Sequence, residues 1–595
     1  MFVGCVALAT SCDLTENVQV KADKSMIFGS KSGLELYSNS FYKALPTLKN
    51  GFMQDKMCDV GAVSNTDTFI KQGAYNTETA TSWSWGALKN INYFIDGCND
   101  PKYCTVDDNT RDNYLGIARW FRAWFYYDKL TTYGEVPWFP HDIQSYQNDV
   151  MYKDRDSRDV IIRNLIADLD FAYEHIQATS STGSSTLTRW AAAALKSRVC
   201  LFEAAYRRYH NLTELEITPE ELYREAAKAA KLVIDNSGCS LNTAAGKKGA
   251  YRDLFYSETP LTQEVILAVC ANEKSGIFGE QNWWFNARSY GLCWSLVRSF
   301  VHTYLKLDGT PFTDAADYAV KSFTEEMEGR DLRLEQTVRG RNFLWDGKTA
   351  VADIKNLSLT GYQVIKYTLD ESKYDGGAKN INSIPLIRYA EVLLNYAEAQ
   401  AELGVITDSE WALTVGALRK RAGITGGTET LPTTVDGYLQ RTFYPDVTSP
   451  VLLEIRRERA IELVAEGMRF DDLRRWKCGS LMETLPWSGI HIPGLEQPVD
   501  VNGDGVDDYY FTEGEVTAAP AAYRNIAIRV NQDGVGLYAE ANAVAGYDLV
   551  YKTGAGDRYW YPDGRQYLYP IPAKVIRDYK NAGYTISQNP YWDNE

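Results

Sequence analysis

The chain has 595 residues, of which 45% are hydrophobic and 24% are charged, a balance that is typical of a folded protein and argues against a disordered one. Its formal charge of −16 and its isoelectric point near 5.0 argue against nucleic acid as a partner, because no basic stripe for binding phosphates stands out in the sequence. Aromatic residues reach 13%, with 40 tyrosines and 15 tryptophans, which exceeds the needs of a core and favours an amphipathic recognition surface.

The chain begins with a short apolar stretch, residues 2–9, that is followed by small residues and Cys12. The stretch is too short to cross a bilayer and resembles the end of a secretory signal peptide. Residues 9–12 resemble a bacterial lipobox, although Leu8 lies one position further from the cysteine than usual. We therefore predict a signal remnant over residues 1–12 with Cys12 as the lipidated residue, the alternative being an ordinary apolar N-terminus.

The eight cysteines beyond this leader have neither metal-type nor redox CxxC spacing. Most are therefore expected to be small buried hydrophobic residues. Only Cys98 and Cys104 lie near each other in sequence, and a bridge between them is one alternative in an oxidising compartment.

Residues 116–138, GIARWFRAWFYYDKLTTYGEVPW, form the first strong helical pattern. The pattern is apolar almost all round and is interrupted at helical spacing by Arg119, Arg122 and Lys129. It predicts a buried helix whose basic residues pair with carboxylates, followed by a turn over residues 133–137.

Two further segments predict an antiparallel helical pair. Thr218 can cap a helix in which Pro219 occupies the first position and Glu221 completes a capping box, and Gly238 ends it. The expected apolar face of this helix is Leu222, Ala226, Ala229 and Val233. The expected apolar face of the preceding helix is Ala191, Leu195, Val199, Phe202 and Tyr206.

The same design recurs in residues 387–404, which end at Gly404, with a partner helix expected from Asp408 to Ala422. Alanines dominate one face of the first helix, and a solvent-facing side is predicted at Glu391, Asn395, Glu398 and Glu402. Helix pairs of this size with small residues on packed faces are typical of tetratricopeptide-like units. We therefore predict a mainly α fold, a tetratricopeptide-like helical superhelix with large loop-rich insertions and a few short strands.

The insertions are expected over residues 240–300, 305–385 and 480–570, which are rich in Gly, Asp, Tyr and Trp. Long irregular segments on a rigid scaffold are where binding surfaces usually lie. A dense charged run over residues 456–475 has the spacing of ion pairs on helix faces, and we interpret it as structural, the alternative being a charged active site.

Several segments, taken in order, resemble the SusD/RagB family of outer-membrane lipoproteins. Residues 116–138 resemble the family's GEA-x-FLRA-x-YY…L…FGDVP signature. The tail at 568–592 resembles the family's closing Pro-Ile-Pro turn and its Gln-Asn-Pro-Gly-Tyr end, except that Tyr591 and Trp592 stand in place of the final Gly and Tyr. The other matching segments are NINYFI at 90–95, RWAAAALKSRVCL at 189–201, IRYAEVLLNYAEAQAELG at 387–404 and IRRERAIELVAEGMRFDDLRRWK at 455–477.

The resemblance implies one continuous fold, with a SusD-like N-terminal half over residues 13–300 and a RagB/SusD C-terminal half over residues 301–595. It also implies a lipid-anchored protein of the outer-membrane surface that binds glycans without catalysis. Such proteins capture oligosaccharides and deliver them to a SusC-like TonB-dependent transporter. A peptide-binding protein of the same architecture and a surface glycosidase are the alternatives.

Glycan binding needs exposed rings that stack on sugar C–H faces and polar groups that bond to hydroxyls. Residues 281–290 offer this mixture, and residues 64–85 form a second-ranked patch, while Trp85 is expected to start a helix and to be buried. In the first patch the predicted ligand contacts are Trp283, Trp284, Asn286, Arg288 and Tyr290, beside Gln281 and Asn282. In the second patch they are Asp67, Tyr75 and Trp83.

Residues 500–508, DVNGDGVDD, alternate oxygen side chains around Gly505 in the manner of calcium-binding loops. A structural calcium ion is therefore one expectation, and a polar turn without a metal is the other. Phe511 stands where an EF-hand has its bidentate glutamate, which argues against an EF-hand. The predicted ligands are Asp500, Asn502, Asp504, Asp508 and the carbonyl of Val506.

No catalytic motif is recognisable in the sequence. The histidines, at 141, 175, 210, 302 and 491, lack ligand spacing. The stretch NFLWDGKT at 342–349 has Asn342 where a phosphate loop needs its first glycine. The chain is therefore predicted not to be an enzyme, although a carboxylate pair among its acidic residues leaves the glycosidase alternative open.

Overall fold

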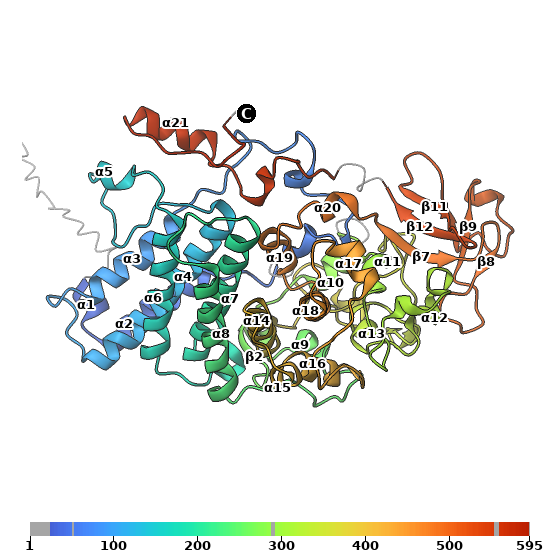
Figure 1. Cartoon of the computed structure of the whole chain (residues 1–595), viewed down its shortest axis with the longest axis horizontal. Helices are drawn as coiled ribbons and strands as arrows, with labels where there is room; N and C mark the ends of the chain where they lie inside the picture. The colour runs from blue at the N-terminus through green and yellow to red at the C-terminus, as the bar shows by residue number, and fades with distance from the viewer. Residues whose placement is uncertain (1–23, 50–52, 287–291, 553–557, 594–595) are drawn as a thin grey trace, which may run out of the picture.

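The computed structural model describes residues 24–49, 53–286, 292–552 and 558–593, and most of its regular structure is helical (Figure 1). A helix long and apolar enough to span a membrane is not found within these ranges. The helices are α1 (Lys24–Phe28), α2 (Lys31–Ser38), α3 (Gly86–Cys98), α4 (Asp108–Tyr133), α5 (Asn148–Met151), α6 (Arg158–His175), α7 (Arg189–Tyr209), α8 (Pro219–Asn236), α9 (Asp253–Tyr256), α10 (Gln281–Asn286), α11 (Arg298–Val301), α12 (Phe323–Met327), α13 (Arg333–Thr337), α14 (Tyr389–Glu402), α15 (Asp408–Leu413), α16 (Val415–Arg421), α17 (Gly437–Phe443), α18 (Pro450–Glu462), α19 (Arg469–Arg475), α20 (Leu481–Thr484) and α21 (Ala573–Asn581).

The strands are short and pair into small separate sheets. They are β1 (Gly61–Ala62), β2 (Val265–Val269), β3 (Ser295–Leu296), β4 (Leu344–Trp345), β5 (Lys348–Thr349), β6 (Ile384–Arg388), β7 (Ser488–Ile492), β8 (Pro498–Val499), β9 (Tyr509–Thr512), β10 (Ala527–Arg529), β11 (Leu537–Ala541) and β12 (Tyr547–Tyr551). Two sheets have three strands, in the orders β10-β9-β8 and β11-β12-β7. The helical pairs α3 to α8 occupy one end of the molecule and these two sheets the other, which confirms a mainly α fold with loop-rich insertions (Figure 1).

The predicted pair of α7 and α8 is confirmed. Thr218 caps α8, its hydroxyl accepts the Glu221 amide, and the Glu221 carboxylate accepts the Thr218 amide, which is the predicted capping box. Gly238 has a φ of 75°, a left-handed conformation that suits glycine after a helix end. The apolar residues predicted for both facing stripes are buried, so the two helices pack through them.

Helix α4 is the buried helix predicted around residues 116–133. It begins earlier, where Asp107 caps the amide of Thr110. Arg122 donates two 2.7 Å hydrogen bonds to the two oxygens of Asp168 on α6, which is a bidentate ion pair inside the protein. Gly134, with a φ of 74°, ends the helix.

The solvent-facing side predicted on α14 is wrong, because three of its four polar residues are buried and the fourth is half-buried. A polar stripe on a helix can face either water or basic side chains of a neighbour, and here it faces arginines of α7, α18 and α19. The contacts are Glu391 with Arg198, Asn395 with Ser197 and Arg459, Glu398 with Arg475 and Trp476, and Glu402 with Arg208 and Tyr209.

The partner helix predicted over residues 408–422 is divided into α15 and α16. The division falls at Thr414, whose backbone leaves the helical region with φ −107° and ψ −92°. The hydroxyl of Thr414 donates to the carbonyl of Glu410 at 2.6 Å and so competes for the helix's own acceptor. The kink lets Gly416 lie close to the backbone of Thr428, a position with no room for a larger side chain.

Most of the charged run over residues 456–475 lies on α18 and α19 and is buried, which confirms its structural interpretation. Glu462 is its centre: one carboxylate oxygen accepts from Arg388 at 2.6 Å and from Arg421, and the other accepts from Arg333 at 2.8 Å. These arginines come from β6, α16 and α13, so one glutamate holds four elements together.

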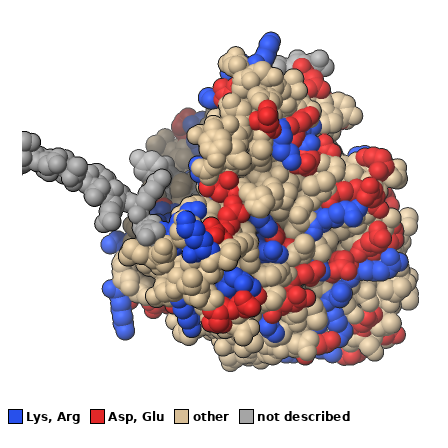
Figure 2. All heavy atoms as spheres, turned by 90° about the vertical axis from the view of Figure 1, so that its left-hand side faces the viewer, with Lys and Arg blue, Asp and Glu red and all other residues tan. Residues whose placement is uncertain are grey.

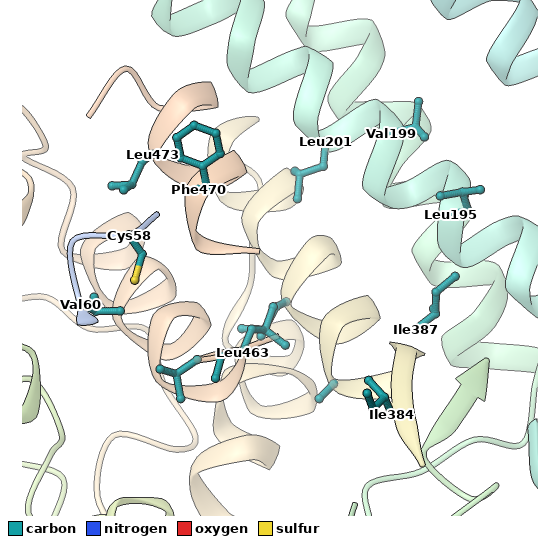
Figure 3. Packing of buried hydrophobic residues seen from close by; sticks show 14 of the residues in the cluster. Cys58, Val60, Leu195, Val199, Leu201, Ile384, Ile387, Leu463, Phe470 and Leu473 are labelled. Carbon is teal, nitrogen blue, oxygen red and sulfur yellow. The ribbon is translucent and has the colours of Figure 1, made fainter. Parts of the chain in front are cut away.

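The main hydrophobic core joins both halves of the chain. Figure 3 shows part of it, where the segment around Cys58, helix α7, strand β6 and helix α19 converge. The labelled residues are Cys58, Val60, Leu195, Val199, Leu201, Ile384, Ile387, Leu463, Phe470 and Leu473. On the outer face of the helical end, acidic and basic side chains are interleaved (Figure 2).

The C-terminal segment returns to the N-terminal half. The ring of Tyr569 stacks on Phe69 with centroids 3.8 Å apart. The Asn589 amide donates to the carbonyl of Tyr133 at 2.9 Å, and the backbone amide of Ala573 donates to the carbonyl of Thr77 at 2.9 Å. These contacts place α21 beside the segment that precedes α3 (Figure 1).

Candidate functional site

The first predicted patch, residues 281–290, is divided by the fold. Asn286 and the neighbouring amides Gln281 and Asn282 are buried on α10. The Asn286 amide group donates to Asp375 at 3.3 Å and its oxygen accepts from Gln363 at 3.2 Å. These amides therefore hold the loop over residues 363–382 and are not presented to solvent.

Trp283 and Trp284 are both half-buried, with ring centroids 5.4 Å apart. They leave part of an aromatic surface outside the core, as their adjacency predicts. Arg288 and Tyr290 lie outside the described residues, so their predicted roles stay predictions.

In the second patch, two of the three predicted residues are engaged within the protein. Asp67 caps the 3-10 turn η3 (Thr68–Ile70) and forms a 2.6 Å ion pair with Lys56. Tyr75 is half-buried, and its ring contacts Phe69 edge-on with centroids 5.1 Å apart. Both residues shape the segment that leads to Trp83.

Trp83 is the predicted residue that lies on a large open cavity, about 1210 Å³ in volume, which we call the α3–α21 cleft. Its ring meets those of Trp85 and Tyr133 edge-on, at centroid distances of 5.3 and 4.9 Å. Trp85 stands at the N-cap of α3 as predicted, but it is only half-buried and also lines the cleft. The prediction that Trp85 is buried is therefore wrong.

The position of Trp83 and Trp85 is fixed from behind. The ammonium of Lys129 donates to the carbonyl of Ser82 at 3.3 Å, and the Tyr133 hydroxyl bonds to the Ser82 hydroxyl at 3.1 Å. Burial raises the pKa of Tyr133 to about 12, so this phenol keeps its proton at neutral pH. Two half-exposed rings held in this way form a pre-organised stacking surface.

Helix α21 forms the opposite wall of the cleft. Of its residues only Tyr579 is buried, and the Tyr579 hydroxyl donates to the carbonyl of Lys153 at 3.2 Å. Tyr152 lines the cleft between them: its ring stacks on Tyr584 at 5.4 Å and meets Tyr579 edge-on at 5.1 Å. Burial raises the pKa of Tyr579 to about 12.

Polar side chains complete the rim of the cleft. Arg577 on α21 donates a 2.5 Å hydrogen bond to Glu78, and this bond lowers the pKa of the Glu78 carboxyl. His141 lies 2.7 Å from Asp96. Lys89, on the first turn of α3, is exposed. The cleft therefore combines flat rings with donors and acceptors around them, the mixture that hydroxyl-rich ligands with apolar faces require.

Sequence reasoning missed α21 and Tyr152 as parts of a site. The amphipathic pattern of residues 573–581 is a signal that this helix packs one face on the body of the protein. No local pattern places it against residues 78–92, because that contact depends on the return of the tail across the whole fold.

In the loop over residues 500–508 the oxygen side chains accept the loop's own backbone amides. Asp500 accepts from Gly503 and Gly505, and Asp504 accepts from Val506, at 2.7–2.9 Å. Among the described residues, a group of three or more His, Cys, Asp or Glu side chains placed to hold a metal is not found. Asn502 donates to Asp504 and Asp508 accepts from the Val501 amide, so these side chains are engaged within the loop, and calcium binding here stays a prediction.

Cys98 and Cys104 are free thiols in this structure. Cys98 is buried, and burial raises its pKa well above the usual value for a thiol. The eight described cysteines are unbridged; Cys58, Cys98 and Cys200 are buried and the other five are partly buried, so the prediction that most of them are buried is wrong.

The sequence model of the SusD family matches residues 263–592. The chain is also similar to the SusD-like protein P38 of Formosa agariphila, with 25% identity over 378 residues. The match covers 61% of this chain and 66% of the relative, which is just under two thirds of the relative's length. Its fold is similar to a SusD-like protein of Bacteroides fragilis, with a TM-score of 0.66 and 19% identity over 96% of this chain and 98% of the other. A second B. fragilis structure, described as a SusD-like carbohydrate-binding protein, has a TM-score of 0.66 and 18% identity over 94% and 99%.

Proposed function

Because the chain belongs to the SusD family, we propose that it is a noncatalytic glycan-binding lipoprotein of the outer-membrane surface. It captures oligosaccharides and delivers them to a SusC-like TonB-dependent transporter, while a lipid on Cys12 anchors it. The description of one structural neighbour as a carbohydrate-binding protein supports this choice of ligand.

The α3–α21 cleft is the observation that carries the proposal. Its volume of about 1210 Å³ exceeds what a small ligand needs and suits a chain of several sugar rings. Trp83 and Trp85 offer ring faces for sugar C–H groups, and Lys89, Arg577 and Glu78 surround them with donors and acceptors. Binding of one chain by several weak contacts of this kind gives specificity without any reacting group.

Isothermal titration against a panel of polysaccharides and peptides, followed by product analysis of the same mixtures, tests the proposal. We expect one glycan class to bind and no reducing ends to accumulate. Binding of peptides alone favours the peptide-uptake alternative, and reducing ends that increase with time contradict a noncatalytic role.

Trp83→Ala tests the site itself. We expect the variant to bind the same glycan at least tenfold more weakly, which corresponds to about 1.4 kcal/mol. Trp283→Ala is the matched control, because Trp283 is also half-buried but lies outside the residues that line the cleft. A loss of binding in Trp283→Ala with full binding in Trp83→Ala assigns the glycan to the α10 patch and refutes the cleft.

Membrane attachment has its own test. In cells that process lipoproteins, Cys12→Ala should move the protein from the membrane fraction to the soluble fraction, and Cys5→Ala should leave it in the membrane fraction. An unchanged distribution of Cys12→Ala contradicts lipidation at Cys12.

A further inference from the structure

A second, smaller cavity of about 410 Å³ lies among the strands at the other end of the molecule. We call it the β10–β12 cavity, since the loop over residues 354–359, strands β10 and β11 and the end of β12 form its walls. It shares no lining residue with the α3–α21 cleft. Figure 1 shows α3 and α21 at one end of the molecule and β11 and β12 at the other, so a ligand in one place does not occupy the other.

The floor of this cavity is apolar and carries one ring. Ile354, Ile528 and Leu537 are buried side chains in its wall. Tyr551 is half-buried, and its ring lies nearly parallel to that of Trp487, with centroids 6.1 Å apart and planes 20° apart. A flat surface held in a fixed orientation suits the apolar face of a small ring. The volume lies within the range of small-molecule sites and below that of the cleft.

The charge of the cavity is opposite to that of the whole chain. Lys355 and Arg529 are its charged lining residues among those described, so the lining is cationic in a protein with a formal charge of −16. Lys355 is exposed, and an ion pair for it is not found in the described part of the chain. Two cations, of which Arg529 is paired with Glu515 and Lys355 is not paired among the described residues, lie beside an apolar floor and favour a small ligand with one anionic group.

Arg529 has a donor available. Its terminal nitrogen contacts Glu515 at 3.2 Å and Gln532 at 3.4 Å, both outside the cavity lining. Its Nε atom is buried and has no hydrogen-bond partner among the described residues. A planar carboxylate is the group whose geometry matches the guanidinium edge.

We propose that the β10–β12 cavity binds a single carboxylated sugar residue of the uronic acid class. The C–H face of the sugar ring packs against Tyr551 and the aliphatic floor, and the carboxylate accepts from Arg529 Nε and from the ammonium of Lys355. The choice of a sugar rests on the proposed function, whereas the charge and the floor alone require a small carboxylate with an apolar face.

Titration with D-glucuronate, D-glucose and acetate tests this site. D-glucuronate should bind at least tenfold more tightly than either of the others, because glucose lacks the carboxylate and acetate lacks the ring. If glucose binds as tightly as glucuronate, the role of the cations is contradicted. If acetate binds as tightly, the site binds anions without recognising a sugar, and the proposal is wrong. Absence of glucuronate binding at millimolar concentration also overturns the proposal.

Variants locate the binding. Lys355→Ala and Arg529→Gln should each weaken glucuronate binding at least tenfold, and Lys248→Ala, an exposed lysine outside both cavities, should not change it. Lys355 is exposed, so its variant tests the site even where Arg529→Gln fails to fold. Unchanged glucuronate affinity in Lys355→Ala refutes the assignment.

Trp83→Ala separates this inference from the proposed function. We expect it to lose oligosaccharide binding in the cleft and to keep full affinity for glucuronate. Glucuronate binding without any oligosaccharide binding in the wild type contradicts the proposed function and leaves the cavity assignment standing. Loss of glucuronate binding in Trp83→Ala places the acidic sugar in the cleft and contradicts the β10–β12 cavity.

Discussion

Replacing Glu462 with Gln removes the charge at the centre of the buried ion network while keeping the shape of the side chain. Glu462 is fully buried and faces three guanidinium groups, those of Arg333, Arg388 and Arg421. The amide of Gln keeps one acceptor oxygen and turns an NH₂ group toward arginine donors, so at least one buried guanidinium contact is lost. The variant therefore tests whether the network determines the stability of the helical body.

The expected loss of stability is about 3–5 kcal/mol at pH 7, the range for breaking a buried ion pair by removing one partner. Individual charge-assisted hydrogen bonds contribute about 1.5–3 kcal/mol, and Glu462 accepts three, so the simple sum is an upper bound. Remaining partners reduce the loss, because Arg388 also contacts Glu264 and Arg333 also contacts Asp331. We therefore expect the lower part of the range.

Urea unfolding of wild type and variant, followed by tryptophan fluorescence, measures the difference. Glu216→Gln is the matched control: Glu216 pairs with Arg163 at the surface, where both side chains are mostly exposed, and its loss should cost less than about 1 kcal/mol. If Glu462→Gln is as stable as Glu216→Gln, then the network adds no net stability and the reasoning fails.

The pH dependence of the same comparison has a definite sign. Burial alone raises the pKa of Glu462, but Arg421, Arg388 and Arg333 outweigh burial and hold the pKa well below its usual value of 4.5. A lowered folded-state pKa contributes stability that is complete above the unfolded pKa and is lost as the pH falls below it. The stability gap between wild type and Glu462→Gln should therefore be widest at neutral pH and should narrow below about pH 4.5, whereas a gap independent of pH contradicts a charge effect.

Three further outcomes are expected. Gly97→Ala should destabilise the fold by about a few kcal/mol in urea unfolding, because a Cβ there meets the ring of Phe28 at 2.0 Å. Gly86→Ala is the control and should be near neutral, because the space around its Cβ is open. Equal unfolding midpoints for the two variants contradict the close packing at Gly97. Burial lowers the pKa of His210 to about 4, so an NMR titration of this residue should show a neutral ring above that pH. Because the unfolded chain takes up this proton at higher pH, the free energy of unfolding should fall as the pH drops below about 6.5. A titration of His210 near pH 6.5 refutes its burial. Calcium binding at residues 500–508 stays a prediction. Calorimetric titration of chelator-treated protein with calcium should show a one-site isotherm. If millimolar calcium produces no heat, the loop is a polar turn that binds no metal.

Local patterns predicted the helical scaffold well, because the determinants lie within a few residues of one another. The capping box of Thr218 and Glu221 needs only a spacing of three residues. The burial of Arg122 follows from an apolar surface on every side of its helix, which leaves an ion pair such as that with Asp168 as the only stable arrangement. Such features can be recognised from the local sequence alone.

The solvent-facing side of α14 could not be predicted in the same way. Glu391 and Glu398 have the spacing of a wet helix face, and nothing within the helix distinguishes water from an arginine on another helix. Arg198 and Arg475 lie 193 and 77 residues away in sequence. A polar stripe predicts a polar neighbour, and only the fold determines which one.

The aromatic site shows the same limit on a larger scale. An excess of rings predicts an aromatic surface, and Trp83 was recognisable as one of its members, but the surface becomes a cleft only because Tyr152 and Tyr579 lie opposite. Those two tyrosines are separated by more than four hundred residues and come together because the tail returns across the N-terminal half.

The two cavities differ in size and in the elements that form their walls. The α3–α21 cleft has one wall on long packed helices and the other on α21, which contacts the body through Tyr579, the Arg577–Glu78 pair, the Ala573 amide and the partly buried Val575 and Ile576. The walls of the β10–β12 cavity are the loop over residues 354–359 and strand residues with buried side chains, among them Ile528 and Leu537. The two proposals therefore assign a chain of sugars to the larger space, about 1210 Å³, and one acidic sugar to the smaller space, about 410 Å³, whose charged lining residues are both cationic.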